Sequence, residues 1–185
     1  MRTVLLLDRP VPGPPPPEAV VRAGDAAETA SPLTAPARGS LAPGPGQARP
    51  RVVIVDDDGT VRRDLRDLLE ENDVTVAGEA GDGAAALEAV SRLVPDVVIM
   101  DNRMPVMHGI EATRRIRERF PYIQVVILTA YDEAALSDEA MGAGAYCYIV
   151  KGGPAGLLVD VVLRAARFGA ELRARDAERR APGTG

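Results

Sequence analysis

The sequence predicts an α/β domain in which helices cover a parallel sheet, and two observations lead to that fold class. The first is a set of short apolar, β-branched runs, of which Asp96–Met100 is typical, with the composition of strands buried on both faces. The second is that segments with helical periodicity separate these runs. Strand and helix therefore alternate five times, the pattern of right-handed crossovers in a parallel sheet.

Each element has its own signal in the chain. Strands are expected at residues 52–55, 74–78, 96–100, 123–128 and 146–150. Helices are expected at 61–69, 85–93, 110–120, 135–141 and 158–168, where apolar residues recur at helical spacing. Asp82 can cap the second helix, Pro121 ends the third, and Gly169 is expected to end the fifth.

The ordered domain is expected to occupy residues 51–168. Residues 1–50 hold 11 of the 16 prolines and show no sustained hydrophobic period, so we expect a disordered Pro/Ala/Gly-rich extension there. Residues 169–185 are polar and are expected to form a frayed tail. Neither segment has the composition of a second folded domain.

Composition restricts the class of protein. The net charge of −5 gives no general electrostatic reason to bind nucleic acid or an anionic membrane. The single cysteine, Cys147, excludes an intramolecular disulfide framework and a cysteine-based zinc site. No apolar run approaches the roughly 20 residues needed to cross a bilayer, and Val4–Leu7 is too short for the core of a secretory signal. We therefore expect a cytoplasmic protein.

Polar side chains follow four of the five predicted strands: Asp56 and Asp57, Asp101, Thr129, and Lys151, the one lysine of the chain. The carboxyl ends of parallel strands meet at one edge of the sheet, where ligands bind. Clustered carboxylates call for a cation, and an all-oxygen ligand set suits Mg²⁺. A lysine and a threonine supply the charge and hydrogen bond that a transferred phosphoryl group needs, and aspartate is an established phosphate acceptor. The residues therefore predict Mg²⁺-assisted phosphorylation of an aspartate.

Four separated motifs resemble the signature of bacterial response-regulator receiver domains. They are Asp56–Asp57, the run from Asp101 through Met104–Pro105 to Gly109, Thr129–Ala130, and Tyr148 with Lys151. The resemblance implies a flavodoxin-like (βα)5 fold, a three-layer sandwich with strand order 2-1-3-4-5. It is closest to receivers that usually precede a LuxR-type helix-turn-helix module; no output domain is expected in this chain, so DNA binding by it is not expected.

The resemblance also implies roles for individual residues. Asp101 would be the phosphoacceptor. Asp57, Asp101 and the main-chain carbonyl of Arg103 would bind Mg²⁺, with Asp56 acting mostly through water. The phosphoryl oxygens would be held by Thr129 and Lys151, with Ala130 leaving room beside them. Tyr148 resembles the aromatic switch residue that turns inward when Thr129 moves toward the phosphate, although strand packing alone would also explain a tyrosine there.

The resemblance implies partners as well. A sensor histidine kinase or phosphotransfer protein would donate the phosphoryl group. The signal would leave through the face made by the fourth helix, fifth strand and fifth helix, toward a downstream protein target or a homodimer. Such a chain would phosphorylate and dephosphorylate itself but would not be a turnover enzyme.

An alternative remains open at this point. The stretch from Val55 through Asp58 to Thr60 also resembles the nucleophile motif of haloacid-dehalogenase-type phosphohydrolases. There Asp56 would be the nucleophile and Asp58 the acid/base. That reading lacks the acidic pair expected after Lys151 and leaves Asp101 unexplained, so the receiver is favoured and Asp58 is expected to be a solvated turn residue.

Several other residues have simpler expected roles. His108, the single histidine, is expected at the surface rather than as a ligand or phosphodonor. Packing roles are expected for Met104, Met107, Met141 and Cys147.

Overall fold

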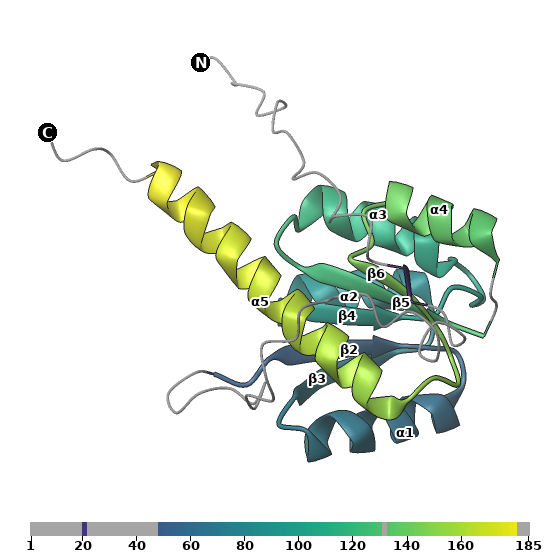
Figure 1. Cartoon of the computed structure of the whole chain (residues 1–185). Helices are drawn as coiled ribbons and strands as arrows, with labels where there is room; N and C mark the ends of the chain where they lie inside the picture. The colour runs from purple at the N-terminus through teal and green to yellow at the C-terminus, as the bar shows by residue number, and fades with distance from the viewer. Residues whose placement is uncertain (1–19, 22–47, 131–132, 181–185) are drawn as a thin grey trace, which may run out of the picture.

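The computed structural model describes residues 20–21, 48–130 and 133–180 (Figure 1). The disorder expected for residues 1–50 therefore falls mostly outside the described residues, as does the end of the predicted tail, 181–185. No helix in the described ranges has the length and hydropathy that crossing a bilayer requires.

The described strands form one parallel sheet at the centre of the molecule. They are β1 (Val20–Val21), β2 (Arg51–Val55), β3 (Thr75–Ala80), β4 (Val97–Met100), β5 (Gln124–Thr129) and β6 (Cys147–Val150). Their order is β1-β6-β5-β4-β2-β3. Without β1, this is the predicted flavodoxin-like order, with the first and third predicted strands (β2 and β4) side by side.

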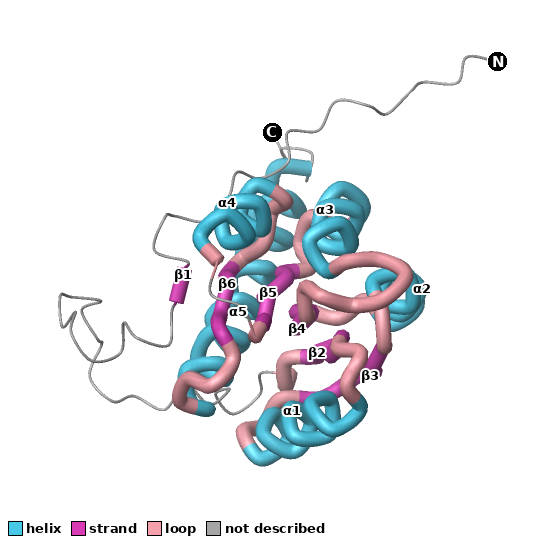
Figure 2. Tube along the Cα trace, turned by 90° about the vertical axis from the view of Figure 1, so that its right-hand side faces the viewer, coloured by secondary structure: helices cyan, strands magenta, loops and turns pink. Residues whose placement is uncertain are grey.

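Helices cover both faces of the sheet. They are α1 (Gly59–Glu71), α2 (Gly83–Leu93), α3 (Gly109–Arg119), α4 (Ala134–Gly142) and α5 (Ala155–Arg180). In Figure 2, α1 and α5 lie on one side of the strands, and α2, α3 and α4 lie on the other. This three-layer arrangement confirms the predicted fold class.

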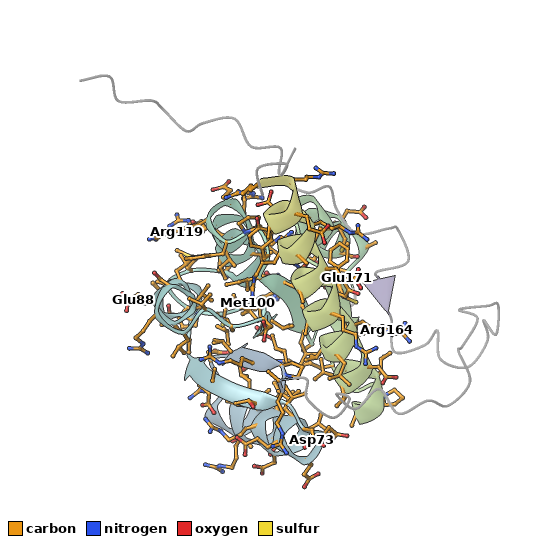
Figure 3. The ribbon with its side chains drawn as sticks, turned by 90° about the vertical axis from the view of Figure 1, so that its left-hand side faces the viewer. Asp73, Glu88, Met100, Arg119, Arg164 and Glu171 are labelled. Atoms are coloured by element: carbon orange, nitrogen blue, oxygen red, sulfur yellow. The ribbon has the colours of Figure 1, made fainter. Side chains whose placement is uncertain are left out.

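Two aliphatic clusters, one on each face, fill the core. Successive strand residues alternate between them, so Val53 packs beneath α2 and α3 whereas Val52 packs beneath α1 and α5. The same alternation places Tyr148 in the first cluster and Cys147 in the second, and both are buried. Figure 3 shows Met100 inside the molecule, with the labelled charged residues around its periphery.

Helix α5 corrects one prediction. Gly169 does not end the helix, which continues to Arg180. A Cβ at Gly169 would overlap the main-chain carbonyl of Tyr122, so the glycine permits a close approach between α5 and the loop before β5. Two contacts hold the turns after Gly169 against the loop before β5. Asp176 accepts a hydrogen bond from the Tyr122 hydroxyl, and the Arg173 guanidinium lies over the Tyr122 ring. The predicted tail is therefore helical up to residue 180.

The strand β1 corrects another prediction. Val20 and Val21 lie within the segment expected to be disordered, yet they pair in parallel with Tyr148 and Ile149. They add a strand beyond β6, which was expected to be the edge of the sheet.

Candidate functional site

The carboxyl ends of β2, β4 and β6 bring two carboxylates and one ammonium into direct contact. Lys151 Nζ donates to Oδ2 of Asp56 at 2.7 Å and to Oδ1 of Asp101 at 2.8 Å. Both aspartates are almost completely buried, with 3% and 7% of their surface exposed. The sequence predicts this meeting, because each residue directly follows a strand of the same parallel sheet.

The second oxygen of each aspartate is also held. Oδ2 of Asp101 accepts a hydrogen bond from the main-chain N–H of Arg103 at 2.7 Å. Oδ1 of Asp56 accepts one from the N–H of Asp58 at 2.9 Å. Each carboxylate is therefore fixed in orientation by one backbone donor and one shared ammonium.

The electrostatics of the site keep Lys151 charged. Burial alone would lower the pKa of Lys151, but hydrogen bonds to Asp101 and Asp56 and the negative charges of both outweigh it and raise the pKa above its ordinary value. Two carboxylates and one ammonium leave a formal charge of −1, which favours a further cation.

The structure gives Asp56 a contact that the sequence did not specify: its carboxylate accepts a hydrogen bond from Lys151 directly. The action of Asp56 on Mg²⁺ through water stays a prediction. The Asp57 side chain is exposed, and among the described residues no group of three or more carboxylate, histidine or cysteine side chains is close enough to hold a metal ion.

The predicted ligand groups have the chemistry that magnesium prefers. Asp57, Asp101 and the carbonyl of Arg103 would provide the oxygen ligands that Mg²⁺ prefers. Among the described carboxylates at this edge, Asp58 is already engaged, since its Oδ1 accepts from Thr60 N–H and caps helix α1. Asp58 is thus an exposed capping residue, consistent with the expected turn role.

Residues predicted to hold or sense the phosphoryl group lie on the neighbouring strands. Thr129 ends β5 and is buried, and its main-chain carbonyl accepts from Lys151 N–H at 2.7 Å. Ala130 is exposed at the same edge. Tyr148 is 1% exposed and lies on β6, three residues before Lys151.

The sequence analysis did not identify a role for Asn102 or explain why position 109 is a glycine. Asn102 Oδ1 accepts from Ile110 N–H, and its carbonyl accepts from Gly109 N–H, so it fastens the start of α3 to the end of β4. A Cβ on Gly109 would overlap the main-chain carbonyl of Asp101. The sequence signal for this close approach was the glycine itself, which ends the motif that contains Met104–Pro105.

A second missed residue is Arg62 on α1. Its Nη1 donates to the main-chain carbonyl of Asp56 at 2.7 Å, while its Nε pairs with Glu79 at 3.1 Å. Arg62 therefore ties the turn that carries Asp56 to strand β3. On the other side of the site, Arg103 pairs with Glu133 just before α4.

His108 and the methionines match their simpler expectations. His108 is exposed and precedes α3 without a capping bond from its side chain. Met104 is buried, and Met107 and Met141 are half-buried against the same core cluster.

Comparison with known proteins decides the family. The model of the response regulator receiver domain matches residues 52–163. The chain belongs to this family. The receiver of the response regulator NarL from Mycobacterium tuberculosis superposes with a TM-score of 0.63 at 34% identity, over 65% of this chain and 98% of that one. This receiver of two-component systems is thus a signalling domain, and the family match favours it over the haloacid-dehalogenase alternative.

Two further proteins are similar to this receiver. The transcriptional regulatory protein YxjL of Bacillus subtilis is 38% identical over 124 residues, 66% of this chain and 57% of YxjL. A CheX–CheY–BeF3–Mg complex from Borrelia burgdorferi gives a TM-score of 0.59 at 25% identity, over 62% of this chain and 87% of that chain. The chain spans about half the length of several curated regulators that it matches.

Proposed function

We propose that this receiver accepts a phosphoryl group on Asp101, from a sensor histidine kinase or a phosphotransfer protein, and signals by a conformational change. The observation that supports this most strongly is the contact of the Lys151 ammonium with the buried Asp101 carboxylate. That carboxylate lies at the ligand-binding edge of the sheet with both oxygens oriented by donors.

The proposed chemistry is a displacement at phosphorus. A carboxylate oxygen of Asp101 forms the new O–P bond as the bond between phosphorus and the donor's leaving group breaks. The Lys151 ammonium offsets the charge of the phosphoryl oxygens, and the Thr129 hydroxyl donates to one of them. Water later hydrolyses the acyl phosphate and restores the carboxylate, so the chain is an acceptor and not a turnover enzyme.

Magnesium is the proposed cofactor. Asp57, Asp101 and the carbonyl of Arg103 would hold it, and the bound ion would reduce the repulsion between the carboxylates and the incoming phosphoryl group. The Borrelia burgdorferi relative was solved with Mg²⁺ and BeF3, which supports this choice by similarity.

The proposed conformational change starts at Thr129 and reaches Tyr148. Thr129 ends β5 and Tyr148 lies on the adjacent strand β6, so a shift of Thr129 toward a phosphoryl group changes the packing next to the tyrosine. The surface made by α4, β6 and α5, here called the output face, would then bind a downstream protein or a second copy.

The function is tested by incubating the chain with Mg²⁺ and acetyl phosphate and measuring its intact mass. A gain of one phosphoryl group by the wild type, and none by Asp101→Asn, supports the receiver. Steady hydrolysis of phosphomonoesters that depends on Asp56 and not on Asp101 would overturn it in favour of a hydrolase.

A further inference from the structure

The two-residue strand β1 lies on the surface through which the receiver is proposed to signal. Val20 pairs with Tyr148 and Val21 with Ile149, in parallel. In Figure 2, β1 lies beside β6 between α4 and α5. A segment outside the matched receiver region, 52–163, therefore covers the middle of the output face.

The backbone of β6 explains why this edge takes a strand. Tyr146 N–H donates to the Val125 carbonyl on β5 at 2.7 Å. Because N–H groups along a strand point alternately to the two sides, those of Cys147 and Ile149 point away from β5, toward β1. Exposed sheet edges of this kind pair readily with any extended segment that reaches them.

The length of the chain allows the pairing within one molecule. Residues 22–50, a stretch of 29 residues, connect Val21 to β2. Four strand spacings separate β1 from β2, about 19 Å at ~4.8 Å per spacing. A connection of 29 residues is long enough to cover that distance, since an extended chain advances roughly 3.3 Å per residue, so the pairing can form within one molecule.

We propose that β1 is an intrachain occupant of the output face, which a downstream protein or a second copy must displace before binding the edge of β6. The proposal rests on the proposed function, since that function makes this face the output surface. A partner for this site would be an extended peptide that pairs in parallel with the edge of β6 through main-chain hydrogen bonds. The segment around Val20–Val21 already occupies that edge and would compete with such a peptide.

Hydrogen–deuterium exchange on the unphosphorylated full-length chain tests this directly. The double variant Val20→Pro/Val21→Pro removes both N–H groups of β1, so whichever one faces β6 is lost. We expect exchange at Cys147 and Ile149 to become at least about tenfold faster, while Tyr146 keeps its protection. The matched control is Val4→Pro/Val11→Pro, which adds two prolines to the same extension outside β1 and should leave β6 unchanged.

A peptide in trans completes the test. The segment from Pro17 to Ala23, added at millimolar concentration, should restore slow exchange at Cys147 and Ile149 in the double variant but change little in the wild type. Three results would each overturn the proposal. Exchange at Cys147 and Ile149 could be unchanged in the double variant, or the peptide could protect the wild type as much as the variant. Protection of these amides could also depend on protein concentration, which would indicate pairing between molecules. Because no phosphoryl group is involved, this failure is distinct from failure of Asp101 to be phosphorylated.

Discussion

Lys151 Nζ lies 2.8 Å from Oδ1 of Asp101, although 50 residues separate the two along the chain. The variant Lys151→Met removes the ammonium and leaves Asp101 facing Asp56 with both carboxylates buried. We expect the free energy of unfolding at pH 7 to fall by about 2 kcal/mol, because the lysine side chain is 26% exposed and solvent moderates the cost of breaking the pair. Urea denaturation measures this, and an unchanged midpoint would show that the pair adds nothing to stability.

The same contact predicts a dependence of stability on alkaline pH. The folded state raises the pKa of Lys151 above its ordinary value of 10.5. The lysine's contribution is therefore fully present below pH 10.5 and is lost as the pH rises through the folded-state pKa. We expect the difference in unfolding free energy between wild type and Lys151→Met to shrink over that interval. A difference that stayed constant from pH 9 to beyond 11 would contradict the raised pKa.

A glycine behind the proposed acceptor predicts a sharp steric effect. In Gly109→Ala the new Cβ would overlap the carbonyl of Asp101, so either the turn before α3 or the end of β4 must move. We expect a loss of about 1–3 kcal/mol in stability and slower phosphorylation by acetyl phosphate. The matched control is Gly142→Ala at the end of α4, where a Cβ meets nothing within 4 Å and stability should not fall. Equal behaviour of the two variants would contradict the close approach at Gly109.

The close approach of α5 to the loop before β5 is tested by another glycine pair. Gly169→Ala places a Cβ against the carbonyl of Tyr122 and should cost about 1–3 kcal/mol in urea denaturation. Gly156→Ala, also in α5, meets nothing within 4 Å and should be neutral or add up to about 1 kcal/mol. Equal stability of the two variants would contradict the close approach between Gly169 and Tyr122.

Much of the fold could be predicted because the signals were local and repeated. The apolar runs of β2, β4 and β5 and the cap at Asp82 needed no tertiary information. The topology of a parallel sheet then required the residues following β2, β4 and β6 to lie at one edge, which is where Asp56, Asp101 and Lys151 meet.

The differences arise where a distant contact decides the local structure. Gly169 is a helix-stop signal in isolation, but the carbonyl of Tyr122 makes it the residue that lets α5 continue. Whether Asp56 contacts Lys151 directly depends on side-chain directions that a strand pattern does not determine. The pairing of Val20–Val21 with β6 depends on an open sheet edge far along the chain, because its own sequence is too short to signal a strand.

The most direct measurement locates the phosphoryl group. The chain is incubated with Mg²⁺ and acetyl phosphate and then treated with borohydride, which reduces an aspartyl phosphate to homoserine, and the product is mapped by tandem mass spectrometry. We predict homoserine at position 101 alone, absent when the magnesium is chelated and absent in Asp101→Asn. Homoserine at position 56 or 57, or none anywhere while the chain remains folded, would contradict the assignment of Asp101 as the phosphoacceptor.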